Sequence, residues 1–186
     1  MIYLFRNILN QEMKSFGSFL KKIETSVVGV KYIYSPNRSD YLSTLRSNNT
    51  YIIVSHGSQD EIYHRFSHNT LKKHQVLLDS SCTNNVGKII AISCGTAKSL
   101  GKQLVERKKC DVYLGFNSKI HFDKKNKVPP SRYYDMYLRK LYKEVFEKVL
   151  IAAITNEWTF QQLCDVLDLE LRRAAKHPRC SGEFAL

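Results

Sequence analysis

The sequence predicts an α/β protein, built as a three-layer α/β/α sandwich with a mostly parallel central sheet. Short apolar runs that suit buried strands alternate with segments whose apolar residues recur every three or four positions, as on one helix face. No Asn-Gly or Asp-Gly pair joins the main apolar runs, so tight hairpins are not expected between them. Parallel strands need long crossover connections, and the intervening helices supply them.

Each expected element follows from its local pattern. Residues 7–24 place Met13, Phe16 and Ile23 on one helical face, whereas VVGVKYIY and YIIVS are rich in the β-branched and aromatic residues of strands. The polar stretch from about 58 to 87 contains SSCTNNVG and predicts an irregular insertion. In chain order we expect a strand or helix start at 2–5, a helix at 7–24, a strand at 27–34, a helix at 37–47, strands at 51–55 and 88–93, a helix at 96–109, a strand at 111–116, a loop at 118–130, and helices at 131–150 and 159–176.

Length and composition favour a single domain. The 186 residues, 43% hydrophobic and 25% charged, are ordinary for one globular core. We therefore expect one domain over 1–186, with a flexible tail from about 177 to 186. No apolar run approaches the roughly 20 residues that cross a bilayer. Because the N-terminus also lacks the pattern of a secretory signal, we expect a cytoplasmic protein without a membrane partner.

The net charge is the unusual bulk property. Lys and Arg number 29 against 17 acids, giving +12, which favours acidic partners such as nucleic acid or an acidic protein. The basic residues are spread along the chain rather than gathered, so nucleic-acid binding stays an alternative that is not favoured. The chain contains neither GxxxxGK[ST] nor GxGxxG, which leaves nucleotide binding without support.

Cysteine and histidine spacing gives little support for a metal site. The five cysteines are irregularly spaced and include no CxxC pair, which fits a reducing compartment and argues against a four-cysteine zinc site. His64 and His68 have the i, i+4 spacing of zinc ligands, but HRFSH lacks the glutamate of HExxH. We expect no metal and no cofactor, with Cys82 exposed in its polar loop and Cys110 in the core.

Two apolar runs end in an ionisable or nucleophilic residue followed by glycine. His56-Gly57 follows YIIVS and Cys94-Gly95 follows KIIAIS, and function gathers at the carboxyl ends of parallel strands. A thiol just before a helix at 96–109 lies near helix N–H groups that favour the thiolate, and a neighbouring histidine supplies a base. Taken singly, each residue is more often structural, a buried thiol or a solvated ring. Their pairing favours catalysis.

The motifs VSHGS and AISCGTAKSLGKQLVE, followed by CDVYLGFNSKI, resemble the caspase-like (clan CD) cysteine peptidases, and most closely the bacterial branch with CHAT-type and gingipain-type domains. The resemblance spans about residues 50–170 and depends on the order and spacing of short motifs. It implies His56 as general acid/base and Cys94 as nucleophile. It also implies that the backbone N–H groups of Gly57 and Cys94 bind the oxyanion.

The chain departs from caspases proper, which have Gln-Ala-Cys-Arg-Gly where this chain has ISCGT, so aspartate specificity is not supported. Substrate contacts are expected at Phe116, Asn117 and Ser118, just past the next strand. Whether Asp60 or a backbone carbonyl orients the histidine stays open.

The resemblance implies an intracellular cysteine endopeptidase that acts on a protein or peptide through an acyl-enzyme. It also suggests a regulated effector of a bacterial antiviral defence or toxin system, with a regulatory protein partner. The alternative is a non-catalytic basic α/β module that binds nucleic acid or an acidic protein.

Overall fold

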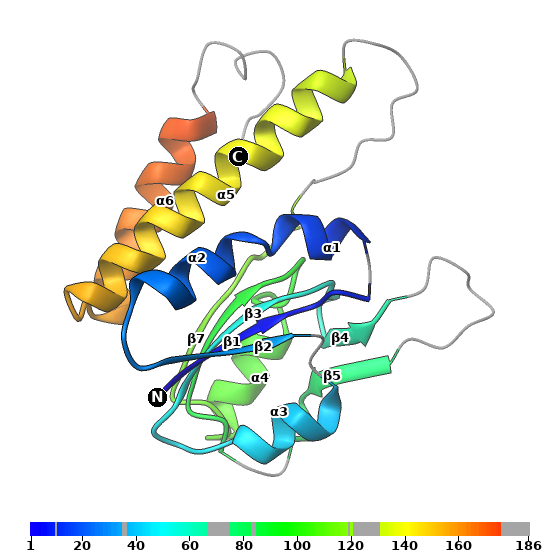
Figure 1. The fold of residues 1–186 in the computed structure, drawn as a ribbon. Helices are drawn as coiled ribbons and strands as arrows, with labels where there is room; N and C mark the ends of the chain where they lie inside the picture. Colours follow the sequence, from blue (N-terminus) through cyan, green and yellow to red (C-terminus); the bar gives the residue numbers. More distant parts are fainter. Residues whose placement is uncertain are drawn as a thin grey trace. The chain divides into compact units, whose positions relative to one another are not determined.

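A five-stranded parallel sheet organises the first 120 residues of the computed structural model (Figure 1). The structure describes residues 1–9, 11–34, 37–66, 75–82, 85–118, 120 and 131–175, and of 131–139 and 175 only the backbone. The strands of the sheet are β1 (Ile2–Arg6), β2 (Val30–Tyr34), β3 (Thr50–Val54), β6 (Lys88–Ile92) and β7 (Val112–Leu114). The segment at 2–5, for which strand and helix were both open, is thus a strand.

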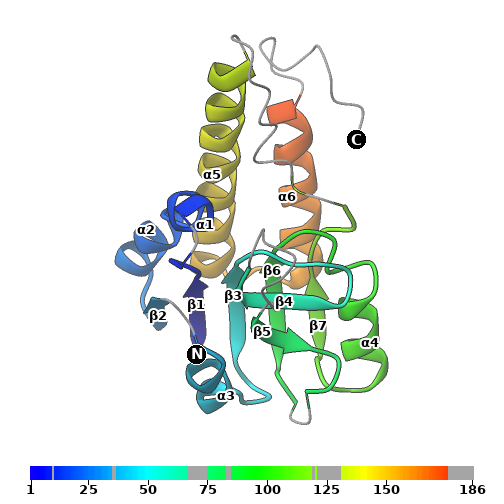
Figure 2. The same cartoon turned by 90° about the vertical axis from the view of Figure 1, so that its right-hand side faces the viewer.

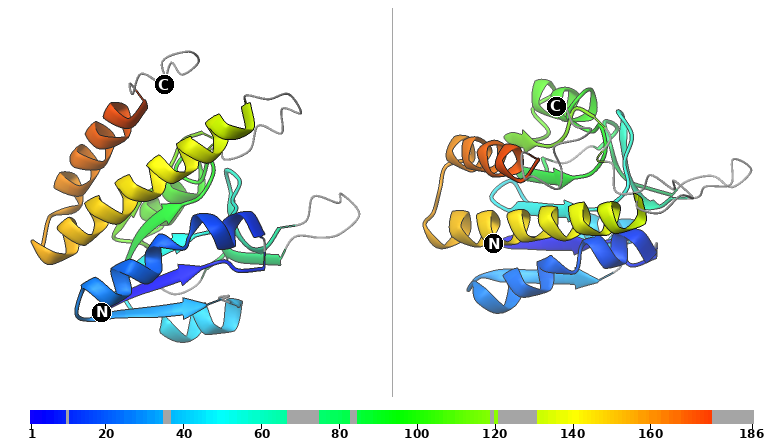
Figure 3. Two further views of the ribbon diagram at one scale, coloured as in Figure 1. Left: turned by 45° about the horizontal axis from the view of Figure 1, so that its top comes forward. Right: turned by 90° about the horizontal axis from the view of Figure 1, so that it is seen from above.

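The strand order is β2-β1-β3-β6-β7, and every neighbouring pair is parallel. The right view of Figure 3 shows this order, from β2 in light blue through β1 in dark blue to β6 and β7 in green. Arg6 lies opposite Val54, and Val54 lies opposite Ile92. The carboxyl ends of β1, β3 and β6 therefore meet at one edge of the sheet.

Helices cover both faces of this sheet. They are α1 (Gln11–Phe16) and α2 (Phe19–Ser26) on one face, and α3 (Arg38–Thr44) and α4 (Leu100–Glu106) on the other (Figure 1). The chain moves one way along the sheet from β1 to β2 and the opposite way from β2 to β3 and from β6 to β7. Right-handed crossovers then place the connecting helices on opposite faces. The predicted three-layer α/β/α sandwich is confirmed.

The helix expected at 7–24 is divided in two at Gly17 and Ser18. Gly17 packs so closely on the sheet that an added β-carbon would lie 3.0 Å from Arg6 Cγ and 3.2 Å from Val54 Cγ1. Glycine is also a poor helix former, so the break falls where the chain must approach the strands. The apolar face predicted from the spacing is buried, with side chains from both helices: Met13, Phe16, Phe19, Leu20 and Ile23.

The stretch at 58–87 is not wholly irregular, and that prediction is wrong. It contains an antiparallel pair, β4 (Glu61–Arg65) and β5 (Gln75–Asp79), which forms a separate two-stranded sheet. Figure 2 shows β4 running across the direction of β3 and β6. Ile62, Leu77 and Leu78 are buried in the same hydrophobic cluster as Phe5 and Ile53. The burial of these side chains stabilises the β4–β5 pair, which no tight-turn motif in the sequence predicts.

Residue contacts set 121–186 apart as a second unit, whose described part is a pair of helices. These are α5 (Ser131–Thr155) and α6 (Phe160–Ala175), which pack against each other and confirm the two expected helices. The expectation of one domain over 1–186 stays a prediction. Of the loop expected at 118–130, residues 119 and 121–130 lie outside the described residues, as does the expected tail at 177–186. Among the described helices, none combines the length and the apolar character needed to cross a membrane.

Candidate active site

The two residues singled out from the sequence follow adjacent strands. His56 lies two residues beyond the end of β3, and Cys94 lies two residues beyond the end of β6. The ladder continues past the strands, since the Ser55 N–H donates to the Ile92 carbonyl at 3.4 Å. Both side chains are half-buried. The structure therefore brings His56 and Cys94 to the same edge of the sheet, at neighbouring positions.

Gly57 packs directly against the turn that carries Cys94. A β-carbon added to Gly57 would lie 2.2 Å from Ser93 Oγ and 2.8 Å from Thr96 Cγ2, closer than real β-carbons approach other atoms. Only glycine fits here without a shift of the neighbours. The glycine after the histidine is thus explained by close approach of two strand ends.

The N–H group of Gly57 points away from β4. Gly57 forms an antiparallel bridge with Ile62 in which the hydrogen bonds come from the flanking residues. The Tyr63 N–H donates to the His56 carbonyl at 2.9 Å, and the Ser58 N–H donates to the Glu61 carbonyl at 2.9 Å. In such a pair the central residues direct their own N–H and C=O outward. This orientation suits the predicted oxyanion role of Gly57.

Two side-chain contacts also stabilise the loop after β3. The His56 ring packs on Phe66, with ring centroids 4.7 Å apart and an angle of 35° between the planes. Asp60 accepts a hydrogen bond from the Ser99 hydroxyl at 2.6 Å, which ties the loop to the residue preceding α4. The Asp60 carboxylate thus has a structural role at α4, and its proposed role in orienting the histidine stays untested.

Asn7 is a site residue that sequence reasoning missed. Its side chain is 2% exposed and donates to Ser55 Oγ at 2.9 Å and to the His64 carbonyl at 2.8 Å. The Ser55 hydroxyl in turn donates to the Tyr63 carbonyl. Asn7 follows β1, where the strand order reverses, and such switch points are where doubly wound sheets place functional groups. An amide two residues past the apolar run IYLF was the available signal.

Cys94 is not at a helix N-terminus, so the prediction of a helix at 96–109 is wrong at its start. Residues 94–99 form turns, and α4 begins at Leu100. The helix dipole therefore does not act on the sulfur as expected. Instead, the Ile120 N–H donates to Cys94 Sγ at 3.3 Å. The Cys94 thiol in turn donates to the Ile120 carbonyl at 3.8 Å, so the backbone of Ile120 holds the sulfur by both of its polar groups.

The segment expected to contact substrate lies alongside this turn. The Ala97 N–H donates to the Phe116 carbonyl at 3.1 Å, and the Gly95 N–H donates to the Ser118 carbonyl at 3.0 Å. Asn117 between them is exposed. Because these two amides of the turn are engaged, the oxyanion role stays with the predicted N–H groups of Gly57 and Cys94, as a prediction.

The rival histidines and cysteines do not form a second centre within the described part of the chain. His64 Nδ1 lies 3.1 Å from Gln75 Oε1 across the β4–β5 pair, whereas His68 and His74 lie outside the described residues. Among described residues, no group of three His, Cys, Asp or Glu could hold a metal ion. Cys110 is buried, as expected, and burial raises its pKa to about 12. Cys82 is only 9% exposed, so the expectation of an exposed thiol is wrong.

Comparisons of the chain with protein-family models, with curated proteins and with solved structures find no match.

Proposed function

We propose that this protein is a cysteine endopeptidase in which His56 and Cys94 form the catalytic dyad. The observation that carries the proposal is the parallel register of β3 with β6, in which Val54 lies opposite Ile92. A base and a nucleophile on adjacent strand ends are the minimum that covalent acyl transfer requires. The close seating of Gly57 against Ser93 supports the same arrangement.

In the proposed reaction, Cys94 Sγ attacks the carbonyl carbon of a peptide bond as the thiolate, and a tetrahedral oxyanion forms. The N–H groups of Gly57 and Cys94 stabilise that oxyanion. His56 gives a proton to the departing amine as the C–N bond breaks and a thioester remains. Water then attacks the thioester and His56 accepts its proton. The C–S bond breaks, which releases the carboxylic acid and restores the Cys94 thiolate beside a protonated His56.

The substrate is a protein or peptide that contacts the backbone and side chains of Phe116, Asn117 and Ser118. The Phe116 and Ser118 carbonyls accept hydrogen bonds from the turn after Cys94, so this segment borders the nucleophile. The proposal includes a cytoplasmic location and a role as a regulated effector of a bacterial antiviral defence or toxin system. That role depends on the resemblance to caspase-like peptidases of the CHAT and gingipain branch.

The test compares three variants of the full chain on a fluorescein-labelled casein substrate. Cys94→Ala and His56→Ala should each lower turnover by about 10³-fold or more, as expected for members of a catalytic unit. Cys164→Ala, which removes another half-buried thiol from α6, should leave turnover unchanged. A peptidyl chloromethyl ketone should modify Cys94, and the modification should slow in His56→Ala. Wild-type turnover in Cys94→Ala would overturn the proposal.

The net charge of +12 favours a second candidate, a non-catalytic module that binds nucleic acid or an acidic protein. Binding to an unlabelled DNA or RNA duplex that falls steeply with salt, together with no turnover and no selective modification of Cys94, would support this candidate.

A further inference from the structure

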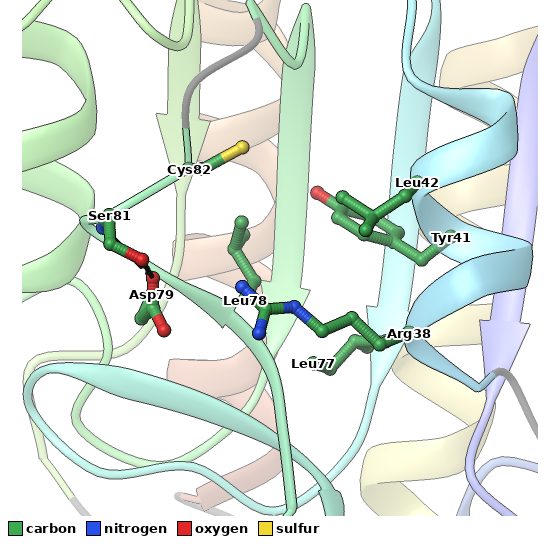
Figure 4. A pocket seen from close by; sticks show the side chains of 8 residues that line it. All are labelled: Arg38, Tyr41, Leu42, Leu77, Leu78, Asp79, Ser81 and Cys82. Atoms are coloured by element: carbon green, nitrogen blue, oxygen red, sulfur yellow. Dashed lines mark hydrogen bonds between the residues drawn. The ribbon is translucent and has the colours of Figure 1, made fainter.

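A pocket between α3 and the β4–β5 pair is separate from the candidate active site and includes none of its residues. Its volume is about 170 Å³. The side chains that define it come from α3, from β5 and from the turn that follows: Arg38, Tyr41, Leu42, Leu77, Leu78 and Cys82 (Figure 4).

Tyr41 provides an unsatisfied polar group at this pocket. Its side chain is fully buried, and its hydroxyl has no hydrogen-bond partner among the described residues. Figure 4 shows the hydroxyl directed across the pocket toward Cys82. Burial raises the pKa of Tyr41 well above its ordinary value, so the hydroxyl keeps its proton and can donate. A buried donor without an acceptor costs free energy that a bound oxygen atom would recover.

The rest of the pocket combines an apolar wall with an arginine and an aspartate. Leu77 and Leu78 are buried, whereas Leu42 is 41% exposed and lines the pocket from α3. Arg38 is exposed, and Figure 4 shows it extended past Leu78. The acid in the lining, Asp79, accepts hydrogen bonds from the N–H and hydroxyl of Ser81. Asp79 keeps its negative charge, so the lining carries one charge of each sign. Its Oδ1 already accepts two hydrogen bonds, whereas no described residue forms a hydrogen bond or ion pair with the Arg38 guanidinium, which leaves that group to bind an anion.

We infer that this pocket binds a small aromatic carboxylic acid with a second oxygen at the far end of the ring, as in a hydroxybenzoate. The ring lies on the leucine wall, the carboxylate pairs with Arg38, and the second oxygen accepts from the Tyr41 hydroxyl. An apolar cavity of about 150 Å³ accommodates benzene, so this pocket fits one ring and excludes a nucleotide. Arginine is suited to carboxylates because its guanidinium donates two parallel hydrogen bonds.

The test is calorimetric titration of the full chain with 4-hydroxybenzoate. For a ligand of this size, we expect a Kd on the order of 0.1–1 mM. Tyr41→Phe should weaken binding about fivefold, and Arg38→Gln about tenfold. Tyr41→Phe removes only the unpartnered oxygen and should fold, and Arg38→Gln changes an exposed side chain. Lys102→Gln, which removes an equal charge from the exposed face of α4, should leave affinity unchanged.

A second readout uses the cysteine in the pocket. Saturating 4-hydroxybenzoate should slow alkylation of Cys82 by iodoacetamide and leave alkylation of Cys164 on α6 unchanged, as followed by peptide mass spectrometry. The neutral analogue 4-hydroxybenzyl alcohol should bind at least tenfold more weakly. Equal affinity for the neutral analogue, unchanged affinity in both pocket variants, or no saturable binding up to about 10 mM would overturn the inference.

Discussion

Gly57→Ala tests whether the ends of β3 and β6 are packed against each other. The new β-carbon would lie 2.2 Å from Ser93 Oγ and 3.1 Å from the Glu61 carbonyl oxygen. Overpacking of a close contact costs about 1–3 kcal/mol, and the backbone neighbour places this site at the upper end. For a chain of this length, each kcal/mol lowers Tm by roughly 2–4 °C. The variant should therefore melt about 5–10 °C below the wild type.

Circular dichroism during thermal and urea unfolding measures this loss, and a double-mutant cycle identifies its cause. Ser93→Ala removes the nearest atom, a buried hydroxyl oxygen without a hydrogen-bond partner in the described part of the chain, so it should be nearly neutral alone. Combined with Gly57→Ala, it should recover roughly 1 kcal/mol through coupling.

Gly95→Ala is the matched control at the same edge. Its β-carbon would meet nothing closer than 3.8 Å, but its φ of +69° favours glycine, so the cost is about 1–2 kcal/mol of backbone strain. Ser93→Ala should not relieve that strain. The reasoning fails if Gly57→Ala is as stable as the wild type, or if its loss is unchanged in the Ser93→Ala background.

Two further predictions follow from buried groups. Asn7→Ala should cost about 2 kcal/mol in urea unfolding, because it removes donors to Ser55 Oγ and the His64 carbonyl. Asn156→Ala, at an exposed position in the turn after α5, should cost under about 0.5 kcal/mol, and equal losses would contradict the bridging role. Stability should fall as pH rises above 9, because burial raises the pKa of Cys110 from its ordinary 9.0 to about 12, so the unfolded chain loses this proton first. Cys110→Ala should make that decline shallower between pH 9 and 10.5 in urea titrations, and an unchanged slope would contradict it.

The central strands β3 and β6 were predictable because they are buried on both faces. TYIIV and KIIAI are apolar at nearly every position, so they can be recognised as strands from the local sequence alone. The helix boundaries were less predictable. Gly17 interrupts an apolar periodicity that continues across it, and the turns at 94–99 include Ala97 and Lys98, which are good helix formers. Their conformations depend on what packs against them, which the local sequence does not contain.

The site was predictable in part for the same reason. The alternation of helices and strands predicts a parallel sheet in which successive strands are neighbours. In such a sheet, His56 and Cys94 lie close together because the strands that precede them are adjacent. The contact from the Ile120 N–H to Cys94 Sγ joins residues that no periodicity links. Asn7 is equally remote in the sequence from the loop that it stabilises, so its role emerged only from the register of β1 with β3.

The β4–β5 pair explains why His56 is held by backbone groups. A crossover helix between β3 and β6 would pair its N–H and C=O groups within the helix, and those along its length could not bind the loop that contains His56. A two-stranded sheet has free outer edges instead. The outer edge of β4 provides the Tyr63 N–H to the His56 carbonyl and the Tyr63 carbonyl to the Ser55 hydroxyl. In an antiparallel strand, the N–H and C=O of one residue point to the same side. Tyr63 of β4 therefore binds two consecutive residues, Ser55 and His56, through its own backbone.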